Sequence, residues 1–265
     1  MASFDFVECT AKSYRFIWQS RADVLRLSLM LLSVKILIFV ALIVFGLQQD
    51  ILRQGLFSLP VYFFEGWVIA QLMVMALYGQ EPERGQAFKL PPPEDIERNV
   101  KASMIVYVLT KLMLSFVLGS TFNAQGELPA ATPPEPSLQI FFMAMMMIVF
   151  MLWSFRFLWL YIPLVLGCQP IDFLRRFQAF SSSFYMVGVW VLCFVPLMIA
   201  MVVVSEFMSM VLGGLGFDQD SVVFRSGLAV IQAIIDYAMS LVSSIGIAFG
   251  IYSVFKGENK KTDIW

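Results

Sequence analysis

The sequence predicts an all-α integral membrane protein with six transmembrane helices. Three observations indicate this fold class. Hydrophobic residues make up 59% of the chain and charged residues only 14%, whereas soluble domains average about one quarter charged. The apolar residues gather in long runs, as membrane spans do. When six runs are counted, the connections between them alternate between rich and poor in basic residues.

Each of the six apolar runs is long enough to cross a hydrocarbon core of about 30 Å at about 1.5 Å per residue. Backbone polar groups in lipid must be paired within their own segment, so the runs are expected to be helices. We predict a single polytopic domain over residues 1–265. Its expected spans are Leu27–Leu47, Leu59–Tyr78, Ala102–Gly119, Leu138–Tyr161, Phe184–Val204 and Leu228–Phe255.

The connections fix the expected orientation. Thirteen Lys and Arg residues fall in the N-terminal segment, the second and fourth connections and the C-terminal tail, whereas only Arg53 and Arg225 fall in the other connections. The positive-inside rule places the basic side in the cytoplasm. We therefore expect both termini in the cytoplasm. No cleavable signal peptide is recognisable, so the first span is expected to serve as the insertion signal. The proline-rich connection Ser120–Ser137 then lies outside.

Three cytoplasmic segments each precede a pair of spans and begin near an aspartate that is suited to cap a helix: Asp5, Asp95 and Asp172. Mixed apolar and basic residues follow, which favours short helices lying in the membrane interface. The pattern is compatible with three repeats of an interfacial helix plus a two-span hairpin. The alternative is that every inward connection looks like this, because positive-inside places basic residues there.

Residues 155–197 combine an arginine within a span, an aromatic and proline-containing stretch, and a surface segment that ends in serines. The residues that carry this pattern are Arg156, Pro163, Ala179 and Ser181–Ser183. It resembles bacterial six-span membrane proteins related to the membrane domain attached to some glycerophosphodiester phosphodiesterases. The resemblance implies six spans, an N-terminal surface helix and a location in a bacterial inner membrane. This chain has Gly167-Cys168 where that family often has an acidic residue, and no phosphodiesterase domain is recognisable. The relatives are mostly of unknown function, so the resemblance implies no activity.

Ionisable residues inside spans are costly, by about 2.5 kcal/mol or more at the centre of the bilayer. Lys35 and Lys111 are expected at equal depth from the cytoplasm, and Glu65 about 7 Å deeper, within reach of a lysine side chain. We predict that Glu65 pairs with Lys35 or Lys111, either as a structural latch or as part of an ion or substrate path. With Asp236 they form the candidate intramembrane polar cluster: Lys35, Glu65, Lys111 and Asp236.

The last span contains Gly246 and Gly250 in a GxxxG pattern, and Ser243 and Ser253 extend the same small face. Small faces permit close contact between helices in a membrane. This candidate helix-packing face is expected either to pack within the monomer or to support a homo-oligomer.

The chain has no histidine, and its three cysteines, Cys9, Cys168 and Cys193, form no CxxC pair. No catalytic or nucleotide-binding motif is present. We expect no enzymatic activity, no cofactor or metal, and no nucleic acid partner. The leading hypothesis is a non-enzymatic membrane subunit or scaffold that associates with lipid or other membrane proteins. The alternative is a small transporter or lipid-handling permease with a polar site near Lys35, Glu65 and Lys111. A polar cavity reaching mid-membrane would favour the transporter, and a packed interior the scaffold.

Overall fold

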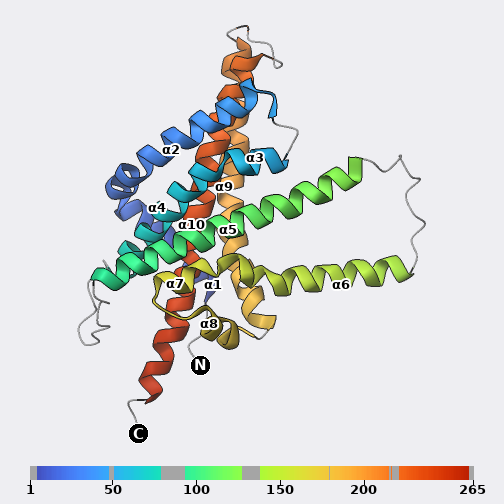
Figure 1. The fold of residues 1–265 in the computed structure, drawn as a ribbon. Coiled ribbons are helices and arrows are strands. Elements are labelled where there is room, and N and C mark those ends of the chain that lie inside the picture. Colours follow the sequence, from blue (N-terminus) through green and yellow to red (C-terminus); the bar gives the residue numbers. More distant parts are fainter. Residues whose placement is uncertain are drawn as a thin grey trace.

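In the computed structural model, residues 5–47, 51–78, 93–126, 138–178, 180–214, 216 and 221–262 are described. All regular structure within those ranges is helical (Figure 1). The helices are α1 (Phe6–Gln19), α2 (Arg21–Val44), α3 (Ile51–Phe57), α4 (Leu59–Tyr78), α5 (Pro93–Gly126), α6 (Leu138–Ser154), η2 (Phe155–Trp159), α7 (Tyr161–Val165), α8 (Pro170–Arg176), α9 (Phe180–Gly214) and α10 (Val222–Thr262).

Six helices in the described part of the chain are long and apolar enough to cross a membrane, and each of the six predicted spans falls on one of them. The chain is therefore a multi-pass integral membrane protein. These helices are Arg21–Val44, Leu59–Tyr78, Glu94–Val117, Met145–Val165, Ser181–Gly214 and Val222–Phe255. Several continue past their expected ends: α5 runs to Gly126, into the connection predicted at Ser120–Ser137. Residues 127–137 of that connection lie outside the described residues.

Helix α10 lies at the centre of the bundle, where it packs against α9, α1, α2 and α4. It buries 61% of its most apolar stretch inside the protein, and α4 buries 56%, whereas α9 buries only 11%. Ile245, Ile247 and Ile251 of α10 are fully enclosed. The interior is thus built around α4 and α10, and α9 leaves most of its surface for lipid.

Helix α1 begins where the sequence predicts, since the carboxylate of Asp5 accepts hydrogen bonds from the backbone N–H groups of Val7 and Glu8. This satisfies backbone donors that the first turn of a helix leaves unpaired. One face of α1 is buried against α9 and α10. There Ser13 Oγ donates to the carbonyl of Val242 at 2.6 Å. Burial raises the pKa of the Cys9 thiol on this face to about 11. Helix α1 is therefore docked against the bundle.

The predictions of N-caps at Asp95 and Asp172 are wrong. Proline favours the first position of a helix, so the cap falls on the residue before the proline. Helix α8 accordingly has Pro170 in its first turn, Gln169 at the cap, and Asp172 inside the first turn. In α5, Asp95 also lies in the first turn, and the helix continues without a break into the span. The three segments therefore differ in their helices, and the threefold repeat stays a prediction.

The fourth span is interrupted near its end, where α6 gives way to the short helices η2 and α7. Arg156 lies in η2 and is buried rather than extended to the interface. Its guanidinium donates to the carbonyl of Phe177 at 2.8 Å and lies 4.3 Å from the Trp153 ring centroid. Arg156 thus pairs a carbonyl that the end of α8 leaves exposed. Ala179, one residue of the family-like pattern, lies outside the described residues.

Candidate functional site

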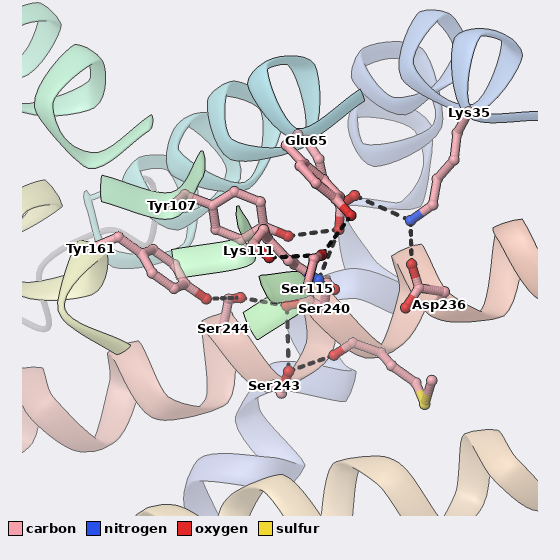
Figure 2. A network of polar contacts seen from close by, with 12 residues as sticks. Lys35, Glu65, Tyr107, Lys111, Ser115, Tyr161, Asp236, Ser240, Ser243 and Ser244 are labelled. Atoms are coloured by element: carbon pink, nitrogen blue, oxygen red, sulfur yellow. Dashed lines mark hydrogen bonds and ion pairs between the residues drawn. The ribbon is translucent and has the colours of Figure 1, made fainter. Parts of the chain in front are cut away.

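The four charged residues predicted as a polar cluster come together in the interior, from four different helices (Figure 2). Lys35 of α2 lies between two carboxylates: its Nζ is 3.1 Å from Oε2 of Glu65 on α4 and 2.5 Å from Oδ2 of Asp236 on α10. Lys111 of α5 approaches Glu65 Oε1 at 3.9 Å. The predicted pairing of Glu65 with Lys35 is confirmed. We call these four residues the charged cluster.

The lysine at the centre of the cluster is almost completely enclosed. The side chain of Lys35 is 2% exposed and that of Glu65 is 0% exposed. An unpaired charge in such a place would be very costly, and each carboxylate lowers the cost of the ammonium between them. Lys35 and Glu65 therefore form the internal part of the cluster, and each depends on the other.

The other oxygen of Glu65 is bound from the opposite side. Tyr107 of α5 donates its hydroxyl to Glu65 Oε1 at 2.7 Å, and its ring meets that of Tyr161 of α7 edge to face, with centroids 5.0 Å apart. Gly66 makes this approach possible, because a Cβ on that residue would lie 3.0 Å from the Tyr107 ring. A wall of aromatic rings therefore closes this side of the charged cluster.

Helix α10 carries a polar stripe that the sequence analysis did not identify. Gln232, Asp236, Ser240 and Ser244 follow one another at intervals of four, so they share one helix face. Ser240 Oγ accepts a hydrogen bond from Lys111 Nζ at 3.3 Å. Ser244 shares a hydrogen bond of 2.7 Å with the hydroxyl of Tyr161. The spacing of polar residues along the last span was the available signal for this stripe.

A cavity of about 430 Å³ borders the charged cluster, and Lys35, Lys111 and Asp236 form part of its lining. Helices α2, α3, α4, α5 and α10 line it, and its polar lining residues are Lys35, Gln54, Ser58, Tyr62, Lys111, Ser115, Gln232 and Asp236. Its size falls within the range of small-ligand sites, about 300–1,000 Å³. The lining residues come from the last turns of α2, the first turns of α4 and α10, and the later half of α5. The cavity therefore belongs to one end of the bundle.

Two members of the charged cluster are partly open to this cavity. The side chain of Asp236 is 43% exposed and that of Lys111 is 25% exposed, although both lie deep in the bundle. Asp236 is thus held inside the bundle by its contact with Lys35. The cluster has an enclosed side, at Lys35 and Glu65, and an accessible side, at Lys111 and Asp236.

The short helix α3 completes the cavity wall. Ile51, Gln54 and Gly55 all line the space. Gly55 lies against α5, where an added Cβ would come within 2.8 Å of the Cβ of Ser115. Only glycine permits this separation. The backbone of α3 therefore lies directly against the side chain of Ser115, and α3 and α5 together close one wall of the cavity.

The predicted helix-packing face of α10 is used inside the monomer. A Cβ on Gly246 would lie 3.0 Å from Val189 and 3.6 Å from Cys193 of α9. Ser243 and Gly250 are buried, and Ser253 is half-buried. Ser243 and Ser253 donate to carbonyls of their own helix. The close contact that small residues allow is thus made with α9 and α1, which is the first of the two alternatives above. A homo-oligomer stays a prediction.

The described residues contain no group of three or more His, Cys, Asp or Glu side chains that could hold a metal ion. The three cysteines are free thiols, and Cys9 and Cys193 are buried. The charged cluster contributes two carboxylates, with an ammonium already placed between them. The arrangement presents an ammonium, on Lys111, and a carboxylate, on Asp236, to a cavity with a polar lining.

No protein-family model, curated protein or solved structure matches the chain. The resemblance carried by Arg156, Pro163, Ala179 and Ser181–Ser183 therefore stays a prediction.

Proposed function

We propose that the chain is a small permease, for a polar solute or a lipid, that binds its substrate in the cavity above the charged cluster. The observation that carries the proposal is a space of about 430 Å³ in which Lys111 and Asp236 remain partly exposed at membrane depth. Charges inside a bilayer are costly, and they commonly mark substrate or ion pathways. A latch alone would favour close packing over its ion pairs.

The orientation of the cavity is part of the proposal. With both termini in the cytoplasm of a bacterial inner membrane, the end at which α2 finishes and α10 begins faces outward. The cavity then opens to the outside, and the aromatic wall of Tyr107 and Tyr161 closes it toward the cytoplasm. Passage would require Lys35 to release Glu65 or Asp236, so the enclosed ion pairs act as the gate.

Cysteine accessibility tests this proposal. In a variant whose three native cysteines are replaced by alanine, Gln232→Cys places a thiol in the cavity. Ile234→Cys is the matched control, because Ile234 is also exposed on α10 but does not line the cavity. A charged, membrane-impermeant thiol reagent added from outside should modify Gln232→Cys at least about tenfold faster, since only a hydrated thiol ionises readily.

A permease also exposes its site to the opposite side during its cycle. In inside-out vesicles, Gln232→Cys should therefore react more slowly than from outside, but still faster than Ile234→Cys. Equal rates for the two cysteines from outside would contradict a hydrated cavity. Reaction from outside alone would indicate a binding protein rather than a permease.

A second candidate, the non-enzymatic scaffold, is favoured by α6. Its residues Phe141, Phe142 and Met145–Met151 are all exposed, and it packs against α9 and η2 at one side of the bundle. A photo-crosslinking residue at position 146 should then give a protein adduct of defined mass in native membranes, and the same residue at Leu25 of α2 should give lipid adducts only. Lipid adducts at both positions would remove the support for the scaffold.

A further inference from the structure

The accessible side of the charged cluster presents two charges of opposite sign at two defined places. Asp236 Oδ2 accepts from Lys35, and the rest of its half-exposed carboxylate faces the cavity. Lys111 also lines the cavity, and its contacts are long: 3.3 Å to Ser240 Oγ and 3.9 Å to Glu65 Oε1. Each group therefore has capacity left for a ligand.

Helix geometry gives the distance between the two places. Lys111 is held next to Ser240, and Ser240 is one turn along α10 from Asp236. Four residues of an α-helix rise about 6 Å. A ligand would thus meet an ammonium and a carboxylate about one helical turn apart, within the reach of one small molecule with a charge at each end.

The overall charge of the cluster selects among ligands. Lys35 and Lys111 balance Glu65 and Asp236, so the cluster is formally neutral. A lone anion at Lys111 would also face Asp236 and Glu65, and a lone cation at Asp236 would face Lys111 and Lys35. Either one would add an uncompensated charge to an enclosed site, which is costly. A ligand carrying both charges meets each with its opposite and adds no net charge.

The rest of the lining fits such a ligand. Gln54, Ser115 and Gln232 add neutral donors and acceptors, whereas Phe39, Leu42 and Leu114 form apolar wall. Small-molecule sites combine an apolar lining with a few placed polar groups. The charged lining suits the charged head group of a ligand, and the apolar lining suits a less polar part joined to that head group.

We propose, resting on the function proposed above, that the cavity binds a zwitterion, with its oxyanion at Lys111 and its ammonium at Asp236. This chemistry occurs in a lipid head group such as that of phosphatidylethanolamine and in free zwitterionic solutes. Both sources satisfy the same two charges.

The test measures protection of Gln232→Cys from the thiol reagent in phosphatidylglycerol vesicles. The free probe is glycerophosphoethanolamine, which is a neutral zwitterion, and its matched controls are dimethyl phosphate, which carries its phosphodiester anion alone, and ethanolamine, which carries its ammonium alone. The lipid arm adds phosphatidylethanolamine to the vesicles. Either the free zwitterion or phosphatidylethanolamine should slow the reaction at least about tenfold, and the single-charge probes less than twofold. Protection by the free probe identifies a solute site, and protection by the lipid alone identifies a head-group site.

Two variants locate the charges. Lys111→Gln removes the ammonium but keeps a donor for Ser240, and Asp236→Asn keeps an acceptor for Lys35. Lys111→Gln should lose zwitterion protection and gain protection by ethanolamine, whereas Asp236→Asn should gain protection by dimethyl phosphate. Undiminished zwitterion protection in both folded variants would overturn the proposal, as would equal protection of the unaltered site by either single-charge probe. Absence of protection by every probe would also overturn it. A failure of the proposed function is distinct, because Gln232→Cys would then react no faster than Ile234→Cys, or would react from outside alone.

Discussion

Two parts of the bundle differ in how many of their side chains the protein buries. The first part is built around α4 and α10, and the second is formed by α6 and α9. Around α4 and α10, more than half of the residues of each apolar stretch are buried, and they enclose charges. Around α6 and α9, most of the exposed residues are apolar, although Glu206 of α9 is exposed as well. Hydropathy alone would class both parts as transmembrane, yet the charged cluster lies in the first part. The exposed side chains of the second part face lipid, whereas the buried side chains of the first part face other residues of the protein.

Among the tests of this difference, Lys35→Met is expected to have the largest effect on the free energy of unfolding. The change leaves Glu65 and Asp236 without their shared ammonium, and breaking a buried pair in this way costs about 3–5 kcal/mol. The free energy of unfolding, followed by circular dichroism in a titration from mild detergent to dodecyl sulfate, should fall by that amount. The triple variant Lys35→Met, Glu65→Gln, Asp236→Asn should recover part of the loss. A loss below about 1 kcal/mol for Lys35→Met would mean that water already reaches the pair.

A smaller effect is expected for Tyr107→Phe, which removes the hydroxyl that donates to Glu65 and keeps the ring against Tyr161. A hydrogen bond to a charged group contributes about 1.5–3 kcal/mol, so the unfolding free energy should fall within that range. Tyr161→Phe is the control, because it removes a bond between neutral hydroxyls and should cost about 0.5–1.5 kcal/mol. Equal losses in the two variants would contradict a charged Glu65.

The smallest effect is expected in the lipid-facing part. Met210 of α9 is 79% exposed and Met146 of α6 is 73% exposed. Replacing either with leucine should change the unfolding free energy by less than about 0.5 kcal/mol. The same substitution at Met73 of α4, which is fully enclosed, should cost up to about 1.5 kcal/mol, because the core must repack. Comparable losses at all three positions would show that α6 and α9 are covered by protein.

The sequence predicts the spans and one ion pair because both depend on position along a single helix. Length and hydropathy locate the six helices, and depth at about 1.5 Å per residue places Lys35 within reach of Glu65. The charge alternation that orients the chain also depends only on position. These properties can be read from one segment at a time.

Which helices become neighbours could not be predicted in the same way. Tyr107 and Tyr161 meet because α5 packs against α7, and the cavity is closed on one side because α3 packs against α5 and α4. Such contacts depend on how helices cross, and many crossings suit the same apolar sequence. The stripe from Gln232 to Ser244 is different, because its four-residue spacing is visible in the sequence. The caps at Asp95 and Asp172 failed for a local reason, since each segment starts at a proline two residues earlier.

The attachment of α1 has a consequence for the order of assembly. Ser13 binds a carbonyl 229 residues further along the chain, and Tyr14 binds one 179 residues further along. Helix α1 is therefore synthesised long before either partner exists, and it can make these two contacts only after α9 and α10 have been made. Closing such long-range contacts is slow compared with forming a helix. Helix α1 is thus made before the two helices that it packs against, and it reaches its native place only after them.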